Sequence, residues 1–134
     1  MPEGCSTWPA IWESGLDNYP NDGEIDILEG ADGVTPNSVT AWTSAGCTIP
    51  DTSARTQTGS TDGTECDVDG GIGCAVWDPL QQSFGAPFNA NGGGWFAMER
   101  TDSFIKVWFW PRDGYPPADV LNNSPSVNTD DWVS

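Results

Sequence analysis

Three acidic side chains alternate with aliphatic residues in the segment from Gly23 to Gly30, which reads Gly-Glu-Ile-Asp-Ile-Leu-Glu-Gly. The aliphatic spacers favour a buried strand, on which Glu24 and Asp26 share one face while Glu29 points to the other. A β-bulge between Asp26 and Glu29 would add one residue and bring all three acids to the same face. Such crowding suits two-carboxylate sugar chemistry, in which one acid stays protonated and another stays charged.

The acid spacing also has a protective interpretation. With 20 acids in 134 residues, a triplet at these offsets arises by chance about 0.4 times. An edge strand can carry exposed acids that prevent aggregation between sheets. The residues around the acidic strand are therefore needed to decide between a catalytic and a protective role.

Tryptophan is the second candidate group, because eight indoles exceed what a core of this size requires. Flat aromatic faces stack on the C–H-rich surface of sugar rings. Trp8 and Trp12 form a Trp-Pro-x-x-Trp pattern shortly before the acidic strand. Trp108 and Trp110 suit either a cleft wall or the core, and we favour the core. Packing is the default interpretation for the remaining indoles, Trp42, Trp77, Trp95 and Trp132.

Several segments resemble, in the same order, the fungal laminarinase-type endo-1,3(4)-β-glucanases of glycoside hydrolase family 16. Besides the acidic strand, the matching segments are 4–12, 37–43 with Gly46-Cys47, 64–67, 73–76, 83–85, 88–89, 92–99 and 105–112. The resemblance implies an all-β fold, the β-jelly-roll sandwich of concanavalin A-like lectins and glucanases. That catalytic module is larger than this chain. We therefore expect residues 1–134 to be its central part, without the N-terminal and C-terminal strands.

The resemblance also implies roles for the three acids. Glu24 matches the catalytic nucleophile, Glu29 the general acid/base, and Asp26 the carboxylate between them that hydrogen-bonds to the nucleophile. A retaining glycosidase holds its two catalytic carboxyl groups roughly 5–5.5 Å apart and forms a glycosyl-enzyme that water then hydrolyses. The implied activity is cleavage of internal β-1,3 and mixed β-1,3-1,4 bonds in glucans. For this chain we expect no cofactor and no metal ion.

Four tryptophans are the substrate-binding candidates: Trp8, Trp12, Trp42 and Trp108. By resemblance, Trp8 and Trp12 lie beside the subsite where the sugar is cleaved. Trp42 marks a departure, because fungal members usually have a histidine in a Thr-Leu-His-Thr string where this chain has Thr-Ala-Trp-Thr. An indole cannot accept a proton, so any acid/base role of that histidine is lost.

Two other functions remain open beside hydrolysis. A non-catalytic glucan-binding relative would keep the fold without turnover. The lost histidine favours such a binder, whereas the intact set of Glu24, Asp26 and Glu29 favours an enzyme. A cell-wall transglycosylase would share the mechanism and differ in acceptor subsites, which the sequence does not reveal.

The net charge of −16 limits the possible partners, since only four cationic residues offset 20 acids. Nucleic acids and anionic membranes require cationic patches, so the composition argues against both. No apolar run approaches the length that spans a bilayer. We expect a monomer that acts on a neutral polymer, namely a β-glucan.

The cysteine pattern bears on localisation. Cys5, Cys47, Cys66 and Cys74 allow three pairings if all are bridged, and one of them could instead bond outside the chain. Zinc binding is the competing interpretation, but the chain has no histidine and no Cys-x-x-Cys. Disulfides favour a secreted, extracellular protein. The chain contains no signal peptide, and we expect the true amino terminus to lie ahead of it.

Turn-forming residues dominate the chain, with 16 Gly and 11 Pro, which favours an all-β fold. We expect strands near residues 7–12, 23–29, 38–43, 74–78, 94–100 and 104–110. The last two form a hairpin closed by Thr101-Asp102-Ser103, and Ile105, Val107 and Phe109 face the core. Surface loops are expected at 50–72 and 113–131, the second with a helical turn at Ala118 to Leu121.

Overall fold

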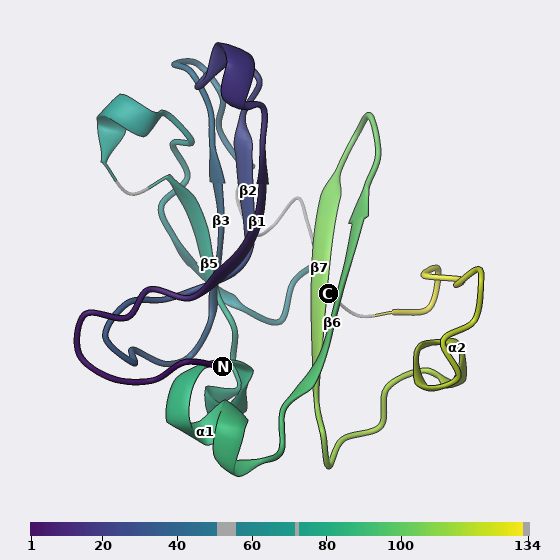
Figure 1. Cartoon of the computed structure of the whole chain (residues 1–134). Helices are drawn as coiled ribbons and strands as arrows, with labels where there is room; N and C mark the ends of the chain where they lie inside the picture. Colours follow the sequence, from purple (N-terminus) through teal and green to yellow (C-terminus); the bar gives the residue numbers. More distant parts are fainter. Residues whose placement is uncertain (51–55, 72, 133–134) are drawn as a thin grey trace.

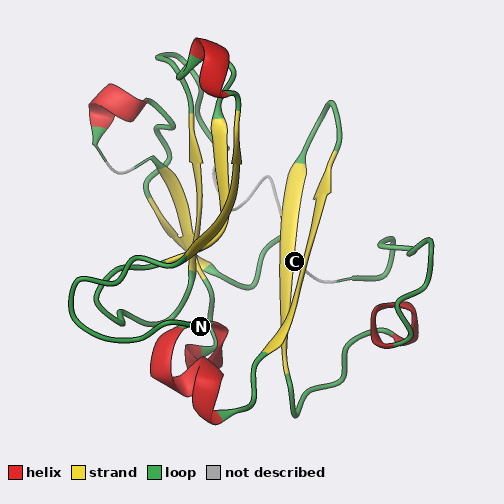
Figure 2. Cartoon of the chain, in the orientation of Figure 1, coloured by secondary structure: helices red, strands yellow, loops and turns green. Residues whose placement is uncertain are grey.

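The structure is a computed structural model that describes residues 1–50, 56–71 and 73–132. Its strands form two sheets that face each other, and its helices are short (Figure 1, Figure 2). The predicted all-β class is confirmed. Part of the predicted loop 50–72, namely residues 51–55 and 72, lies outside the described residues.

The larger sheet has five antiparallel strands in the order β1-β2-β3-β5-β4. Their bounds are β1 Ala10–Ser14, β2 Glu24–Glu29, β3 Ser38–Trp42, β4 Ser60–Asp62 and β5 Cys74–Trp77. The acidic strand β2 lies between β1 and β3, so it is an interior strand of this sheet. The protective interpretation of its acids as an edge device therefore does not apply.

The first strand begins later than the sequence predicted. The prediction ran over 7–12, whereas β1 spans Ala10–Ser14 and leaves Pro9 just outside. Proline has no N–H to donate to a ladder, which explains why the strand starts after it. The shift places Trp12 inside β1 and Trp8 in the segment that leads into it.

The second sheet is the hairpin of β6 Gly94–Arg100 and β7 Ile105–Pro111. The predicted turn is confirmed. The Thr101 N–H donates to the Phe104 carbonyl at 2.9 Å, and the Thr101 hydroxyl accepts from the Phe104 N–H at 3.1 Å. On the inner face of the hairpin, Phe109 and Phe96 pack with a centroid distance of 4.7 Å.

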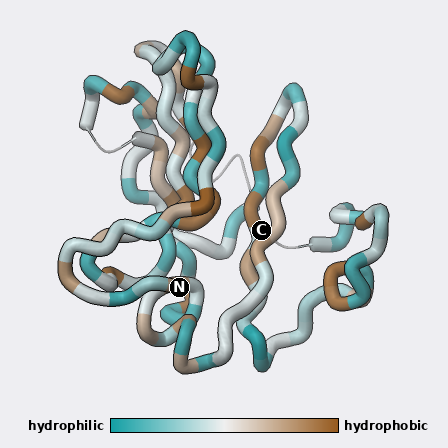
Figure 3. The backbone as a smooth tube through the Cα atoms, viewed as in Figure 1, coloured by the Kyte–Doolittle hydropathy of each residue, from teal (hydrophilic) through white to brown (hydrophobic). Residues whose placement is uncertain are grey.

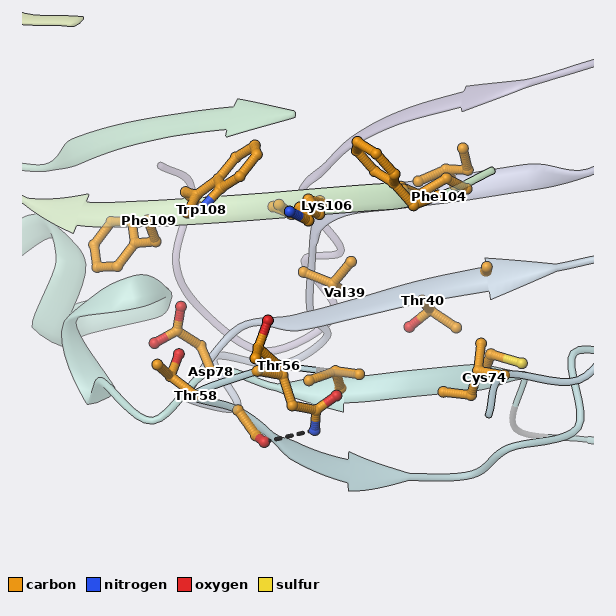
Figure 4. Close-up of a pocket in the computed structure, with 18 of the residues that line it drawn as sticks. Val39, Thr40, Thr56, Thr58, Cys74, Asp78, Phe104, Lys106, Trp108 and Phe109 are labelled. Carbon is orange, nitrogen blue, oxygen red and sulfur yellow. Dashed lines mark hydrogen bonds between the residues drawn. The ribbon is translucent and has the colours of Figure 1, made fainter. Parts of the chain in front are cut away.

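The space between the two sheets is the apolar interior of the molecule. Both sheets carry hydrophobic stretches on their strands, while the hairpin tip is hydrophilic (Figure 3). A cavity of roughly 940 Å³ remains between them, lined by side chains that include Val39, Val76 and Phe109. Val39 extends from β3 toward β7, and Phe109 projects from β7 toward the five-stranded sheet, whereas Trp108 lies on the other side of β7 (Figure 4). Phe109 thus faces the core as predicted (Figure 4), whereas Ile105, which was predicted to face it too, is 45% exposed.

The helices are short, and one of them packs against the hairpin. The α-helices are α1 Gly85–Ala90 and α2 Ala118–Leu121, and α2 lies where the sequence predicted a helical turn. The sequence analysis missed α1, whose Phe88 contacts Phe96 and Phe109 of the hairpin at centroid distances of 6.4 and 6.2 Å. Among the described residues, no helix is long and apolar enough to cross a membrane.

The predicted loop 50–72 contains ordered elements. Strand β4 pairs with β5, and a 3₁₀ turn, η3, spans Val68–Gly70. Cys66 and Cys74 form a disulfide, while Cys5 and Cys47 are free and exposed. Of the pairings that the sequence left open, the described residues therefore contain one bridge, which joins the end of this segment to β5.

Candidate active site

A β-bulge in β2 determines where the three acids point. Along the β1–β2 ladder, Ala10 pairs with Glu29, Trp12 with Asp26, and Ser14 with Glu24, so that Ile27 is left without a partner. Directly paired residues share a face, and alternate residues of β1 also share a face. Glu24, Asp26 and Glu29 therefore lie on one face of the sheet. The bulge predicted between Asp26 and Glu29 is present.

Asp26 is the buried centre of this group, with 2% of its surface exposed. Burial, followed by the charges of Glu29 and Glu24, raises the pKa of Asp26 to about 7, although the Trp42 N–H lowers it in part. A hydrogen bond with the side chain of Glu29 also raises the pKa of the Asp26 carboxyl. Since two carboxylates have no hydrogen between them, this bond requires one shared proton. The hydrogen bond that the resemblance implied between Asp26 and Glu24 stays a prediction.

Glu24 lies at the start of β2 in a more open position. Burial and then the charge of Glu29 raise the pKa of the Glu24 carboxyl above its usual value. Tyr19, which sequence reasoning missed, lies near the same group. Burial, then the charges of Glu24 and Asp26, raise the pKa of the Tyr19 hydroxyl. In the sequence, the only indication that Tyr19 belongs to the site was its position in the loop before the acidic strand.

Two exposed indoles border the acids on the β1 side. Trp8 is 70% exposed, and its Nε1 donates a 2.9 Å hydrogen bond to Oε1 of Glu29. Trp12 is half exposed and lies opposite Asp26 in the ladder, on the acid-bearing face. Both flat rings are accessible beside the carboxyl groups, which is the arrangement that sugar stacking needs.

Trp42 borders the acids on the β3 side. It pairs with Glu24 in the β2–β3 ladder, and its Nε1 donates a 3.0 Å hydrogen bond to Oδ2 of Asp26. The backbone of Gly73 packs against the indole, because a Cβ at Gly73 would lie 3.0 Å from Trp42 Cδ2. The default interpretation of Trp42 as a packing residue missed this contact, since spacing along the sequence does not show which acid an indole reaches.

Two other tryptophans were assigned from the sequence to the substrate-binding candidates (Trp108, although the core was favoured for it) or to packing (Trp77). Trp108 is only 3% exposed, and its ring packs edge-on against Trp132 at a centroid distance of 5.2 Å. The structure thus places Trp108 in packing, away from the acids. Trp77 lies on the acid-bearing face, opposite Ser38 in the β3–β5 ladder, and its Nε1 donates to Oδ2 of Asp62 at 2.9 Å. The alternation of side chains along β5 would have placed Trp77 on this face once the register between β3 and β5 was known.

The acid-bearing face thus has a definite chemistry. It presents one carboxyl with a pKa near neutrality between two others, with indoles on both sides. Within the described residues, no group of three or more His, Cys, Asp or Glu side chains is placed to hold a metal ion. The groups present can transfer protons, attack an electrophilic carbon and stack on flat apolar rings.

The sequence profile of the XgeA-like catalytic domain of glycoside hydrolase family 16 matches residues 1–134. The chain belongs to glycoside hydrolase family 16. A probable endo-1,3(4)-β-glucanase of Aspergillus niger is 43% identical to this family 16 chain over 123 residues, which is 92% of the chain and 16% of that relative.

Solved structures of the family match the same fold. A laminarinase 16A of Phanerochaete chrysosporium, described with two β-glucans in its donor and acceptor sites, is 50% identical with a TM-score of 0.92. The match covers 98% of this chain and 45% of the laminarinase chain. An elongating family 16 β-1,3-glucosyltransferase is 41% identical with a TM-score of 0.81, over 94% of this chain and 41% of its own.

These matches confirm the predicted fold, because the laminarinases of family 16 have a jelly-roll fold. The two sheets of this chain are therefore parts of a jelly-roll sandwich. The family 16 chain spans 16% of the length of the Aspergillus niger relative and less than half of the laminarinase chain.

Proposed function

We propose that this chain carries the catalytic centre of a retaining endo-β-glucanase, which cleaves internal β-1,3 and mixed β-1,3-1,4 bonds of glucans. The bulge at Ile27 is the observation that carries the proposal, because it brings Glu24 and Glu29 to one face with Asp26 between them. A retaining mechanism needs two carboxyl groups on the same side of the scissile bond. The family 16 relatives include proteins named endo-1,3(4)-β-glucanase, which supports this substrate class.

The proposed mechanism assigns one role to each acid. Glu24 attacks the anomeric carbon and forms a glycosyl-enzyme, while Glu29 protonates the departing oxygen and later activates water. Near neutral pH one proton is shared between the carboxyl groups of Asp26 and Glu29, and Glu29 passes it to the departing oxygen. Trp8 fixes the Glu29 carboxyl through its N–H, and Trp12 offers an exposed face for the sugar ring.

The proposal is tested with the full-length protein on laminarin and on mixed-linkage β-glucan. The wild type should release reducing sugar, and NMR should detect the β-anomer of the new reducing end first. Glu24→Gln should abolish release, because an amide cannot form the glycosyl ester. Glu13→Gln is the matched control, since Glu13 pairs with Arg100 at the opposite face of the sheet. Full activity of Glu24→Gln would refute the assignment of the nucleophile.

Transglycosylation is a second candidate activity, favoured by the likeness to a β-1,3-glucosyltransferase at 41% identity. The two activities share the glycosyl-enzyme and differ in whether water or a sugar hydroxyl accepts the glycosyl group. Incubation with a laminari-oligosaccharide distinguishes them. Products longer than the starting sugar indicate transfer, and only shorter products indicate hydrolysis.

The remaining parts of the proposal concern the protein's surroundings. We place it outside the cell as a secreted fungal protein, supported by the Cys66–Cys74 disulfide and by relatives that are fungal. Its partner is the β-glucan polymer. The net charge of −16 supports a monomer that binds neither nucleic acid nor an anionic membrane.

A further inference from the structure

The second half of β2 lacks regular backbone partners on the side of β3. The β2–β3 ladder pairs Glu24, Ile25 and Asp26 with residues of β3 and then stops. Beyond Asp26, the side chain of Asn37 forms the hydrogen bonds to the β2 backbone that a neighbouring strand would otherwise form. Oδ1 of Asn37 accepts the Glu29 N–H at 2.9 Å, and Nδ2 of Asn37 donates to the Ile27 carbonyl at 3.0 Å.

One planar amide therefore substitutes for a peptide unit of the neighbouring strand. It supplies one acceptor and one donor, and the bulged backbone offers the matching donor and acceptor. Alanine at this position would leave both backbone groups without this partner, and aspartate would lack the donor for Ile27. The Asn37 side chain is thus the direct backbone contact of the residue that carries the proposed acid/base.

Asn37 is itself held firmly. It is completely buried, as is Ser83. The Asn37 N–H donates to Oγ of Ser83 at 2.9 Å, and that hydroxyl donates onward to the Leu80 carbonyl at 2.7 Å. The Asn37 carbonyl accepts the Asp78 N–H at 2.9 Å. Since its backbone is bonded on both sides, the amide has little freedom to move.

Phe84, which follows Ser83 in the chain, contacts the same end of β2. Phe84 is buried, and its ring lies against Gly30, directly after Glu29. A Cβ built on Gly30 would be 2.6 Å from Cε1 of Phe84, so the two groups approach as closely as a glycine allows. Ser83 therefore restrains the Glu29 backbone through its hydrogen bond to Asn37, and Phe84 restrains it by packing against Gly30.

We propose that Asn37, held by Ser83, is a positioning residue that fixes the Glu29 backbone where its carboxyl can protonate the glycosidic oxygen. This inference rests on the proposed function for the identity of the reaction. Its geometry, the contact between the Asn37 amide and the Glu29 N–H, is independent of it.

The kinetic test compares substrates that differ in their need for a proton. In the full-length protein, Asn37→Ala should lower kcat/KM on laminarin on the order of 100-fold, since a small misplacement of a catalytic group has that effect. An aryl β-laminarioside with a good leaving group needs no protonation and should lose far less. Gln57→Ala is the matched control, because its amide also bonds to a backbone carbonyl, that of Gly59 at 2.7 Å. The control should leave the ratio of the two kcat/KM values unchanged.

Equal losses on both substrates would overturn the proposal and leave Asn37 a purely structural role. If Asn37→Ala does not fold, Ser83→Ala removes one contact and keeps the amide. The same preference for the activated substrate then supports the proposal, and its absence contradicts it. If the wild type cleaves neither substrate, the proposed function fails, and amide hydrogen exchange decides the inference. In Asn37→Ala or, if that variant does not fold, Ser83→Ala, the Glu29 amide should exchange faster relative to the Ile25 amide than in the wild type. An unchanged ratio of the two exchange rates would overturn the inference.

Discussion

The indole of Trp42 donates a 3.0 Å hydrogen bond to the carboxyl group of Asp26, which is the most buried acid of the site. Trp42 also lies opposite Glu24 in the ladder, so one side chain adjoins two of the three acids. An indole N–H does not titrate in the accessible pH range. Trp42 therefore favours the charged form of Asp26 to the same extent at every pH, unlike the titratable histidine that the fungal enzymes this chain resembles usually have there.

Replacing Trp42 by phenylalanine tests this relationship. Trp42→Phe keeps an aromatic ring and removes the N–H that stabilises the charged carboxyl, so the pKa of Asp26 should rise above about 7. NMR titration of the Asp26 carboxyl carbon measures it. Trp110→Phe, in the hairpin, should leave the titration unchanged. A lower pKa in Trp42→Phe would contradict the assigned direction.

The stability of the folded state should depend on pH in a defined direction. Burial raises the pKa of Asp26 to about 7, and it also raises those of Glu24 and Asp78. The folded state therefore binds more protons than the unfolded state between about pH 4 and 7, and its free energy of unfolding falls as pH rises through that window. Each unit of pKa shift corresponds to about 1.4 kcal/mol.

Denaturant melts at pH 5 and pH 8 check this dependence. The wild type should have the higher free energy of unfolding at pH 5. Asp26→Asn cannot ionise and keeps an oxygen for the Trp42 N–H, so its dependence should be shallower. Greater stability of the wild type at pH 8 would show that the carboxyl pKa values are not raised by folding.

Glu29→Ala should affect substrates according to their leaving groups. General acid catalysis contributes about 10²–10⁴-fold, so kcat/KM on laminarin should fall within that range. An activated aryl glycoside leaves without a proton and should keep most of its kcat/KM. Steady-state kinetics on both substrates make the comparison, with Glu99→Ala in the hairpin as the control. Equal losses on the two substrates would count against the acid/base role of Glu29.

Gly30→Ala should destabilise the protein. The added methyl group would lie 2.6 Å from the buried ring of Phe84, and inserting a methyl into a packed site costs about 1–3 kcal/mol. Gly70→Ala is the control, because its nearest contact would be an ordinary 3.7 Å from Cβ of Asp67. Thermal melts compare the two variants. A Tm for Gly30→Ala as high as that of the control would mean that Phe84 can move aside.

Much of the acidic strand could be predicted from sequence, because its signals are local. The run of aliphatic residues indicated a strand, and the odd spacing between Asp26 and Glu29 indicated a bulge that the ladder contains. The hairpin was also predictable, since two alternating segments flank a short polar turn. Strand β4 was missed because Ser60–Asp62 has no hydrophobic alternation and gains its order from pairing with β5.

The supports of the site could not be predicted in the same way. Asn37 and Ser83 are 46 residues apart, and their hydrogen bond follows from how distant loops pack. The contact between Trp42 and Asp26 depends on the register of two strands, which a single sequence does not show. Buried polar partners of this kind satisfy backbone groups that irregular strands leave open, so they are chosen by the tertiary fold.

The hairpin is attached unequally at its two ends. At its base, Phe88 of α1 packs against Phe96 and Phe109 at centroid distances of 6.4 and 6.2 Å. At its tip, Arg100 meets Glu13 of β1 in a 2.7 Å ion pair whose side chains are 59% and 38% exposed. Exposed ion pairs contribute at most about 1 kcal/mol and weaken in salt. We therefore expect the thermal fluctuations of the hairpin to be larger at its tip than at its base, and to increase with ionic strength.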